Sequence, residues 1–139
     1  MIAVETVIAK LDADLTYTVQ MAKDVLPNWQ DLTALPIIFV GYHSIDCKEP
    51  NVPLESTIFN TNGENLVQNF EIHIVCSVSA FRTVWINVYK SLIGWNPVAT
   101  EIYHSGFTFA QGGKMGISNS KLWDVSVWRI GFPTNQGLV

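Results

Sequence analysis

The feature that most constrains the fold of this chain is a segment in which apolar and polar residues alternate. One set of alternate positions is apolar throughout, and the positions between are mostly polar. Successive side chains of a β-strand point to opposite faces, so this pattern predicts a half-buried strand. The apolar face consists of Phe70, Ile72, Ile74, Cys76 and Val78, and the polar residues opposite are Asn69, Glu71, His73 and Ser77.

The hydrophobic period changes directly after this strand. Large apolar residues then recur at intervals of three and four, which is the spacing of one helix face. Ser79 is the expected N-cap, and Gly94 with Pro97 is expected to end the helix. The apolar stripe is Phe81, Val84, Trp85, Val88 and Leu92, and the side expected to face water carries Arg82, Asn87, Lys90 and Ser91.

Two further elements are predicted in the first third of the chain. Residues 2–13 are predicted to form a helix, because their apolar residues recur at the same three- and four-residue spacing. Residues 37–43 are short, β-branched and aromatic, which is typical of a strand buried on both faces. Residues 14–29 are compatible with either a strand or a continued helix, and residues 46–53, with two prolines, are expected to form a loop.

The last third of the chain is predicted to be β-structure. A turn is expected at residues 61–64, strands at 102–109 and 122–132, and a flexible glycine loop at 112–116. The final strand carries Trp123, Val125 and Val127 on one face. Large apolar residues also occupy its other face, so a second surface needs covering. The tail from residue 133 is expected to be loose.

The order helix, strands, helix, strands predicts the fold class. Strands that are segregated from two helices favour an α+β fold with a mostly antiparallel β-sheet and the two main helices packed on one face. The 139 residues fit a single domain, 1–139, and can bury a core without disulfides.

Charged side chains are scarce in this chain. Asp, Glu, Lys and Arg make up 14% of the residues, against about 25% in typical soluble domains, and the mean hydropathy is +0.22. A membrane span needs about 20 apolar residues, whereas the best run, 35–42, has eight. Glu5 precedes the first basic residue, Lys10, so no signal peptide is expected and synthesis is assigned to a cytoplasm. The outer surface is therefore expected to be covered by partner proteins.

Residues capable of chemistry form no recognisable motif. His43, His73 and His104 lack metal-binding spacing, and Cys47 and Cys76 do not form a CxxC pair. His73 and Cys76 are three apart on a strand and should point to opposite faces. The glycine loop lacks the frame of a phosphate-binding loop, and the absence of a basic run argues against unspecific nucleic-acid binding. No catalytic residue, metal site or cofactor is predicted, and we expect no enzyme activity.

The order of motifs in the second half resembles a family of phage proteins. A helix leads into Gly94-Trp95 and Pro97, and a strand, a Gly-Gly element and a closing strand from Leu122 to Phe132 follow. This arrangement resembles the tail terminator (tail completion) proteins of long-tailed bacteriophages, of the Mu-like and lambda-like groups.

The resemblance implies a structural role in a virion. Such proteins form a ring, usually a homohexamer, that caps the tail tube, ends tube polymerisation and joins the tail to the head or neck. The implied partners are further copies of the chain, the tail tube protein, a head-completion or neck protein, and a sheath protein if the tail is contractile. Genomic DNA passes through the channel. The implied location is the head-proximal end of the tail, after assembly in the host cytoplasm.

Two alternatives remain open at this point. The chain could be another phage neck or head–tail connector protein, or a small cytoplasmic ligand-binding α+β domain with a cleft of ionisable groups. Five residues are candidates for the interface with other subunits: tryptophan is enriched at contact centres, and Arg129 is a single cation among apolar neighbours. The candidates are Gly112, Gly113, Lys114, Trp128 and Arg129.

Overall fold

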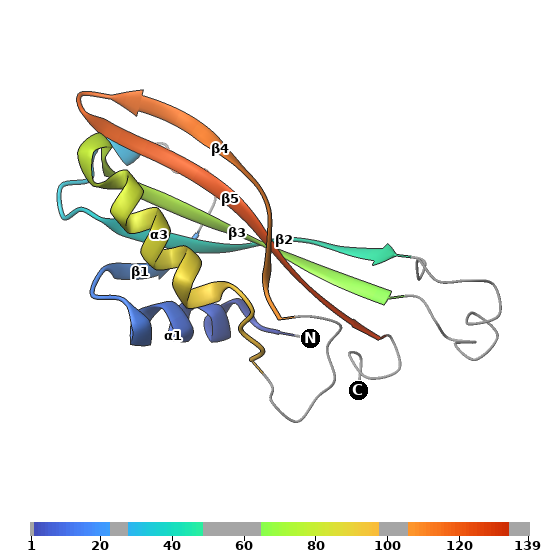
Figure 1. Ribbon diagram of the computed structural model, residues 1–139. Helices are drawn as coiled ribbons and strands as arrows, with labels where there is room; N and C mark the ends of the chain where they lie inside the picture. Colours follow the sequence, from blue (N-terminus) through green and yellow to red (C-terminus); the bar gives the residue numbers. More distant parts are fainter. Residues whose placement is uncertain (1, 23–27, 49–64, 98–105, 134–139) are drawn as a thin grey trace.

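A computed structural model describes residues 2–22, 28–48, 65–97 and 106–133 (Figure 1). Five strands form one sheet in the order β1-β2-β3-β5-β4. The short β1 is parallel to β2, and every other neighbouring pair is antiparallel. The strands are β1 (Thr18–Met21), β2 (Ile37–Lys48), β3 (Asn65–Ser77), β4 (Thr108–Ser118) and β5 (Lys121–Pro133).

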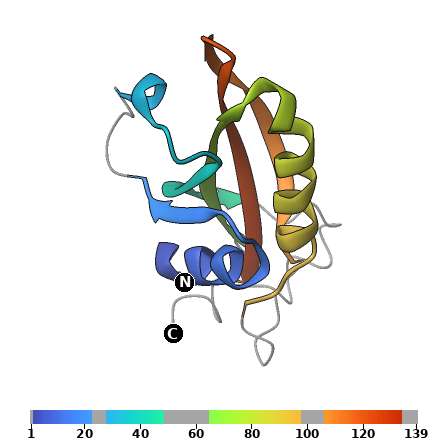
Figure 2. The same cartoon turned by 90° about the vertical axis from the view of Figure 1, so that its left-hand side faces the viewer.

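The predicted α+β architecture is confirmed. Helices α1 (Val4–Asp14) and α3 (Phe81–Leu92) cover the same face of the sheet (Figure 2). Helix α1 lies beside β1 and β2, whereas α3 contacts β3 and reaches β4 and β5 through ring contacts. The main core forms between the helices and this face of β2, β3 and β5. Trp128 and Phe70 are its largest fully buried side chains.

The alternating strand and the amphipathic helix after it form as predicted. Phe70, Ile72, Ile74 and Cys76 are fully buried under the helices. Val78 does not continue this face, because the chain turns into the 3-10 helix η2 (Val78–Ala80), which leaves the Val78 side chain 45% exposed.

Two polar residues around α3 have roles other than those predicted. Ser79 is not the N-cap that the sequence predicts, because the N-cap position of α3 is Ala80. The side-chain cap belongs to the preceding 3-10 helix η2, where Ser77 Oγ accepts a hydrogen bond from the backbone N–H of Ala80. Ser91 is buried and not on the wet side, because its hydroxyl donates to Asp14 Oδ2 at 2.7 Å and ties α3 to α1. The contact with α1 therefore buries Ser91, although the pattern of α3 alone places it on the exposed side.

The predicted glycine loop is wrong. Gly112 and Gly113 lie within β4, opposite Ser126 and Val125 of β5. Two irregularities in the β4–β5 register interrupt this strand, and glycines inside a strand commonly accompany such bulges. The reversal instead occurs at Asn119 and Ser120, which have φ values of 50° and 65°.

The predicted loop that starts at residue 46 is also wrong at its beginning. Strand β2 continues through Lys48, because its backbone stays paired with β3 as far as Asn65. The rest of that prediction, the turn at 61–64, most of the strand at 102–109 and the tail lie outside the described residues.

Candidate interaction surface

The sheet face opposite α1 and α3 is covered at one end by the segment around the 3-10 helix η1 (Trp29–Asp31). Trp29 packs against Ile37, Phe39 and Val75, and its ring centroid lies 5.9 Å from that of Trp123. The Lys121 ammonium holds this segment, because it donates to the carbonyls of Gln30 at 2.6 Å and Leu32 at 2.8 Å. We call the rest of this side, the surface of Glu71, His73, Val125 and Val127 with its border residues, the open face.

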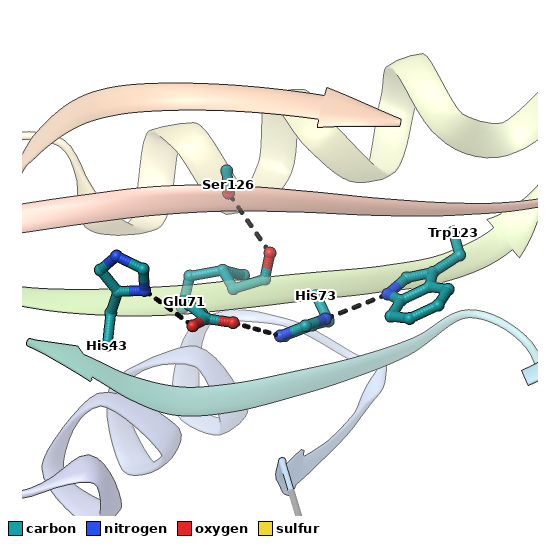
Figure 3. Close-up of polar contacts among 6 residues, drawn as sticks. His43, Glu71, His73, Trp123 and Ser126 are labelled. Atoms are coloured by element: carbon teal, nitrogen blue, oxygen red, sulfur yellow. Dashed lines mark hydrogen bonds and ion pairs between the residues drawn. The ribbon is translucent and has the colours of Figure 1, made fainter. Parts of the chain in front are cut away.

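A chain of four polar side chains crosses the open face (Figure 3). Trp123 Nε1 donates to His73 Nδ1 at 3.0 Å, and His73 Nε2 lies 3.0 Å from Glu71 Oε1. His43 Nδ1 lies 2.8 Å from Glu71 Oε2. Because an indole N–H can only donate, His73 Nδ1 is the acceptor and its Nε2 carries the proton toward the carboxylate. Both oxygens of Glu71 are thus engaged.

The surroundings of these four side chains determine the charge of Glu71. Burial lowers the pKa of His73, and although Glu71 raises it, the net pKa stays below its usual value. Burial raises the pKa of Glu71, but the hydrogen bonds from His43 and His73 outweigh it and lower the net value. With its pKa held below the usual value, Glu71 is a carboxylate near neutral pH, and its two oxygens lie against the imidazoles of His43 and His73.

A shallow groove of about 380 Å³ lies beside these side chains. Its floor includes Val125 and Val127, and its border is polar. Such a surface can accept apolar contacts and a few hydrogen bonds. Within the ranges given above, no group of three or more His, Cys, Asp or Glu residues could hold a metal ion. The remaining lining residues are His43, Glu71, His73 and the β4 stretch 111–115.

Three of the five predicted interface residues lie together. Gly112, Gly113 and Lys114 are exposed on β4, which forms one edge of the sheet. Residues 111–115 are all exposed, although the ring of Phe109 lies close to Gly112. No described strand pairs with the outer side of β4.

The other two predicted interface residues lie on opposite sides of β5. Trp128 is fully buried in the chain's own core, next to Tyr89 and Phe109, and presents no surface to a partner. Arg129 is partly buried on the far side of the strand, and its Nε has no hydrogen-bond partner among the described residues. Because that Nε is itself buried, it is not a donor that a partner protein could reach.

The cysteine chemistry considered from the sequence has no support in the described residues. Burial, with a smaller contribution from the charge of Asp124, raises the pKa of the Cys76 thiol to about 11. His73 lies on the opposite face of β3, as predicted, and cannot act as its base. Cys76 is therefore an apolar core residue, and the side chains of Cys47 and His104 lie outside what is described.

Sequence reasoning missed the link between His43 and His73. The alternation of β3 placed Glu71 and His73 on one face, but His43 joins them through the pairing of β2 with β3. The register of that pairing shifts between Tyr42 and Ser44, which leaves His43 without an opposite residue. A shift of this kind has no local sequence signal.

Comparison with known proteins gives a likeness in fold. No family model matches the sequence, and no curated protein matches it. Among solved structures, the chain is similar to a chain of the virion of a native gene transfer agent (GTA) particle, with 17% sequence identity and a TM-score of 0.50. The similarity covers 90% of each chain, so the two share a fold over nearly their whole length. No described helix has the length and apolar character needed to span a membrane.

Proposed function

We propose that this chain is a structural protein of a tailed, phage-like virion, and specifically a tail terminator. In this role copies of the chain form a ring, six as the family resemblance implies, that caps the tail tube and joins it to the head or neck. The observation that carries the proposal is the fold likeness to a chain of a GTA virion, which extends over 90% of both chains. The motif order in the second half of the sequence independently led to the same class of protein.

The surface supports a role in an assembly. Interfaces are depleted in charge at their centres and enriched in aromatic residues and methionine. The open face has an apolar floor, and large apolar side chains are exposed on both edge strands. Met115 and Ile117 of β4 are 58% and 56% exposed, and Met21 of β1 is 39% exposed. Neighbouring proteins that cover these residues would account for the low charge of the chain.

The partners follow from the role. Copies of the chain contact one another within the ring, the tail tube protein binds one side, and a head-completion or neck protein binds the other. A sheath protein is a further partner if the tail is contractile. DNA only passes through, and a net charge of −4 per copy suits a channel that must not retain it. We assign no catalytic activity and no cofactor to the chain.

The test is electron microscopy of the purified protein mixed with tail tubes that lack their cap. The proposal predicts rings at one end of each tube and tubes that no longer elongate. Binding to portal-side proteins with no affinity for tubes would identify a neck or connector protein instead. A protein that stays a monomer and binds neither would overturn the virion role.

A further inference from the structure

The sheet ends in two strands whose outer sides pair with no described strand. These are β1 on one side and β4 on the other (Figure 1). Strand β1 has α1 beside it, and α3 reaches β4 through a ring contact. An unpaired strand edge offers a row of backbone donors and acceptors to another chain.

The two edges carry opposite charge. Helix α1 holds three carboxylates and one lysine, and that lysine, Lys10, is already paired with Asp14 at 2.8 Å. Helix α3 and strand β4 together hold three cations and no acidic residue. The charges of these elements thus differ across the sheet, since α1 beside β1 is net acidic and α3 with β4 is basic.

The acidic residues left over on α1 face away from α3. Lys10 and Asp14 lie toward α3, since Asp14 accepts from Ser91. Glu5 and Asp12 are exposed and seven residues apart, so they share the opposite stripe of the helix. We call this pair the acidic edge.

The basic residues are placed in the corresponding way. Arg82 lies three residues before Trp85 and seven before Tyr89, which puts all three on the side of α3 toward β4 and β5. Lys114 is exposed in the middle of β4. Among the described residues no carboxylate forms an ion pair with Arg82 or Lys114, although Lys114 lies opposite the buried Asp124 in the β4–β5 register. We call this pair the basic edge.

We propose that the basic edge of one copy docks on the acidic edge of the next, with β4 adding to β1 across the contact. Extending the strand order places β4 antiparallel to the next copy's β1, with all helices on the same face. A contact between two different edges is head-to-tail, and repeated head-to-tail contacts close into a ring when the rotation permits. Lys114 and the two bulges of β4 discourage pairing of this edge with an arbitrary strand. The attraction between the basic edge and the acidic edge then selects β1 of another copy as the partner. This inference rests on the proposed ring and names the surface that builds it.

The test uses two double variants of the full chain. One reverses the acidic edge (Glu5→Lys with Asp12→Lys), and the other reverses the basic edge (Arg82→Glu with Lys114→Glu). Alone, each variant opposes like charges at every contact, and we expect the concentration for half-assembly to rise at least about tenfold. Mixed in equal amounts, the two variants again match at every contact, so rings form with the two copies alternating. Lys90→Glu, on the side of α3 toward α1 and so on neither edge, should assemble like the wild type.

Sedimentation velocity and native mass spectrometry of each variant and of the mixture read out the result. Recovery in the mixture also shows that both variants fold. Rings from either variant alone, or a mixture that fails to recover, would overturn the edge contact while leaving a tube-capping ring possible. A wild-type chain that binds tube ends as single copies would overturn it too. A different result would overturn the proposed function itself: a wild-type chain that neither assembles nor binds tubes.

Discussion

At the scale of single residues, Gly116 has a role that its neighbours explain. A Cβ at this position would lie 2.9 Å from Cζ2 of Trp29, closer than side-chain atoms pack. The missing side chain lets the Trp29 ring rest on β4 and cover one end of the sheet. Gly113 in the same strand has open space around a Cβ built there.

These two glycines give a matched pair of variants. We expect Gly116→Ala to lower the free energy of unfolding by about 1–3 kcal/mol, because the Trp29 ring must shift. Gly113→Ala should be neutral or stabilising by up to about 1 kcal/mol, because it only restricts the unfolded chain. Urea unfolding followed by tryptophan fluorescence measures both. Equal effects of the two changes would show that Trp29 does not pack on Gly116.

Asp124 is a buried carboxyl whose effect on the free energy of unfolding depends on pH. It is 5% exposed, and its Oδ2 has no hydrogen-bond partner among the described residues. Burial, opposed by the charge of Lys114, raises its pKa from 3.8 to about 6. The folded state therefore holds the proton more tightly than the unfolded state, so this contribution to stability is lost as the pH rises through about 6.

Asp124→Asn should remove that loss. At pH 8 the variant is expected to exceed the wild type by about 1–3 kcal/mol in free energy of unfolding, and the gain should largely disappear near pH 4. Urea titrations at both pH values provide the measurement, with Asp12→Asn, at an exposed position, as control. A gain that is the same at pH 4 and pH 8 would contradict the ionisation argument.

At the scale of elements, the β4–β5 hairpin depends on a reversal with two residues in the left-handed region. Asn tolerates a positive φ, whereas Ser120 does so at a cost. Ser120→Gly should therefore raise the free energy of unfolding by about 0.5–1 kcal/mol. Ser118→Gly, inside β4, should lower it by a similar amount. Thermal unfolding of the two variants checks this pair, and shifts of the same sign would mean that the reversal lies elsewhere.

The elements that the sequence predicts well are those with a strong local period. The spacing of Val7 and Leu11 identified α1, that of Val84 and Val88 identified α3, and alternation identified β3 and β5. The glycine loop predicted at 112–116 is wrong because glycine is common in both turns and strand bulges. Only the pairing with β5 shows that this segment is a strand. The burial of Ser91 was hidden because it depends on a contact with α1, 77 residues away in the sequence.

The candidate surface was predictable only in part. Lys114 and its two glycines were interface candidates, and they are exposed on β4, whose outer side pairs with no described strand. Trp128 was chosen for its residue type, but its own core buries it completely. The hydrogen-bonded set on the open face needs three strands in register, which a single sequence does not specify.

At the scale of the whole molecule, the net charge of α1 beside one edge of the sheet is opposite to that of α3 and β4 at the other edge. If opposite edges attract, salt should weaken the contact, since the Debye length falls from about 10 Å at 0.1 M to about 3 Å at 1 M. We expect the concentration for half-assembly to rise severalfold over that range in sedimentation equilibrium. Assembly that instead strengthens with sodium chloride would point to apolar contacts as the dominant attraction.

We propose that this chain is built into a virion at the head-proximal end of the tail. Cryo-electron microscopy of intact particles that contain the chain tests this most directly. We expect one ring of density at the junction of tail tube and neck, into which this sheet fits with its helices on one side. Particles whose junction is built entirely from other proteins, with this chain absent from the purified virion, would contradict it.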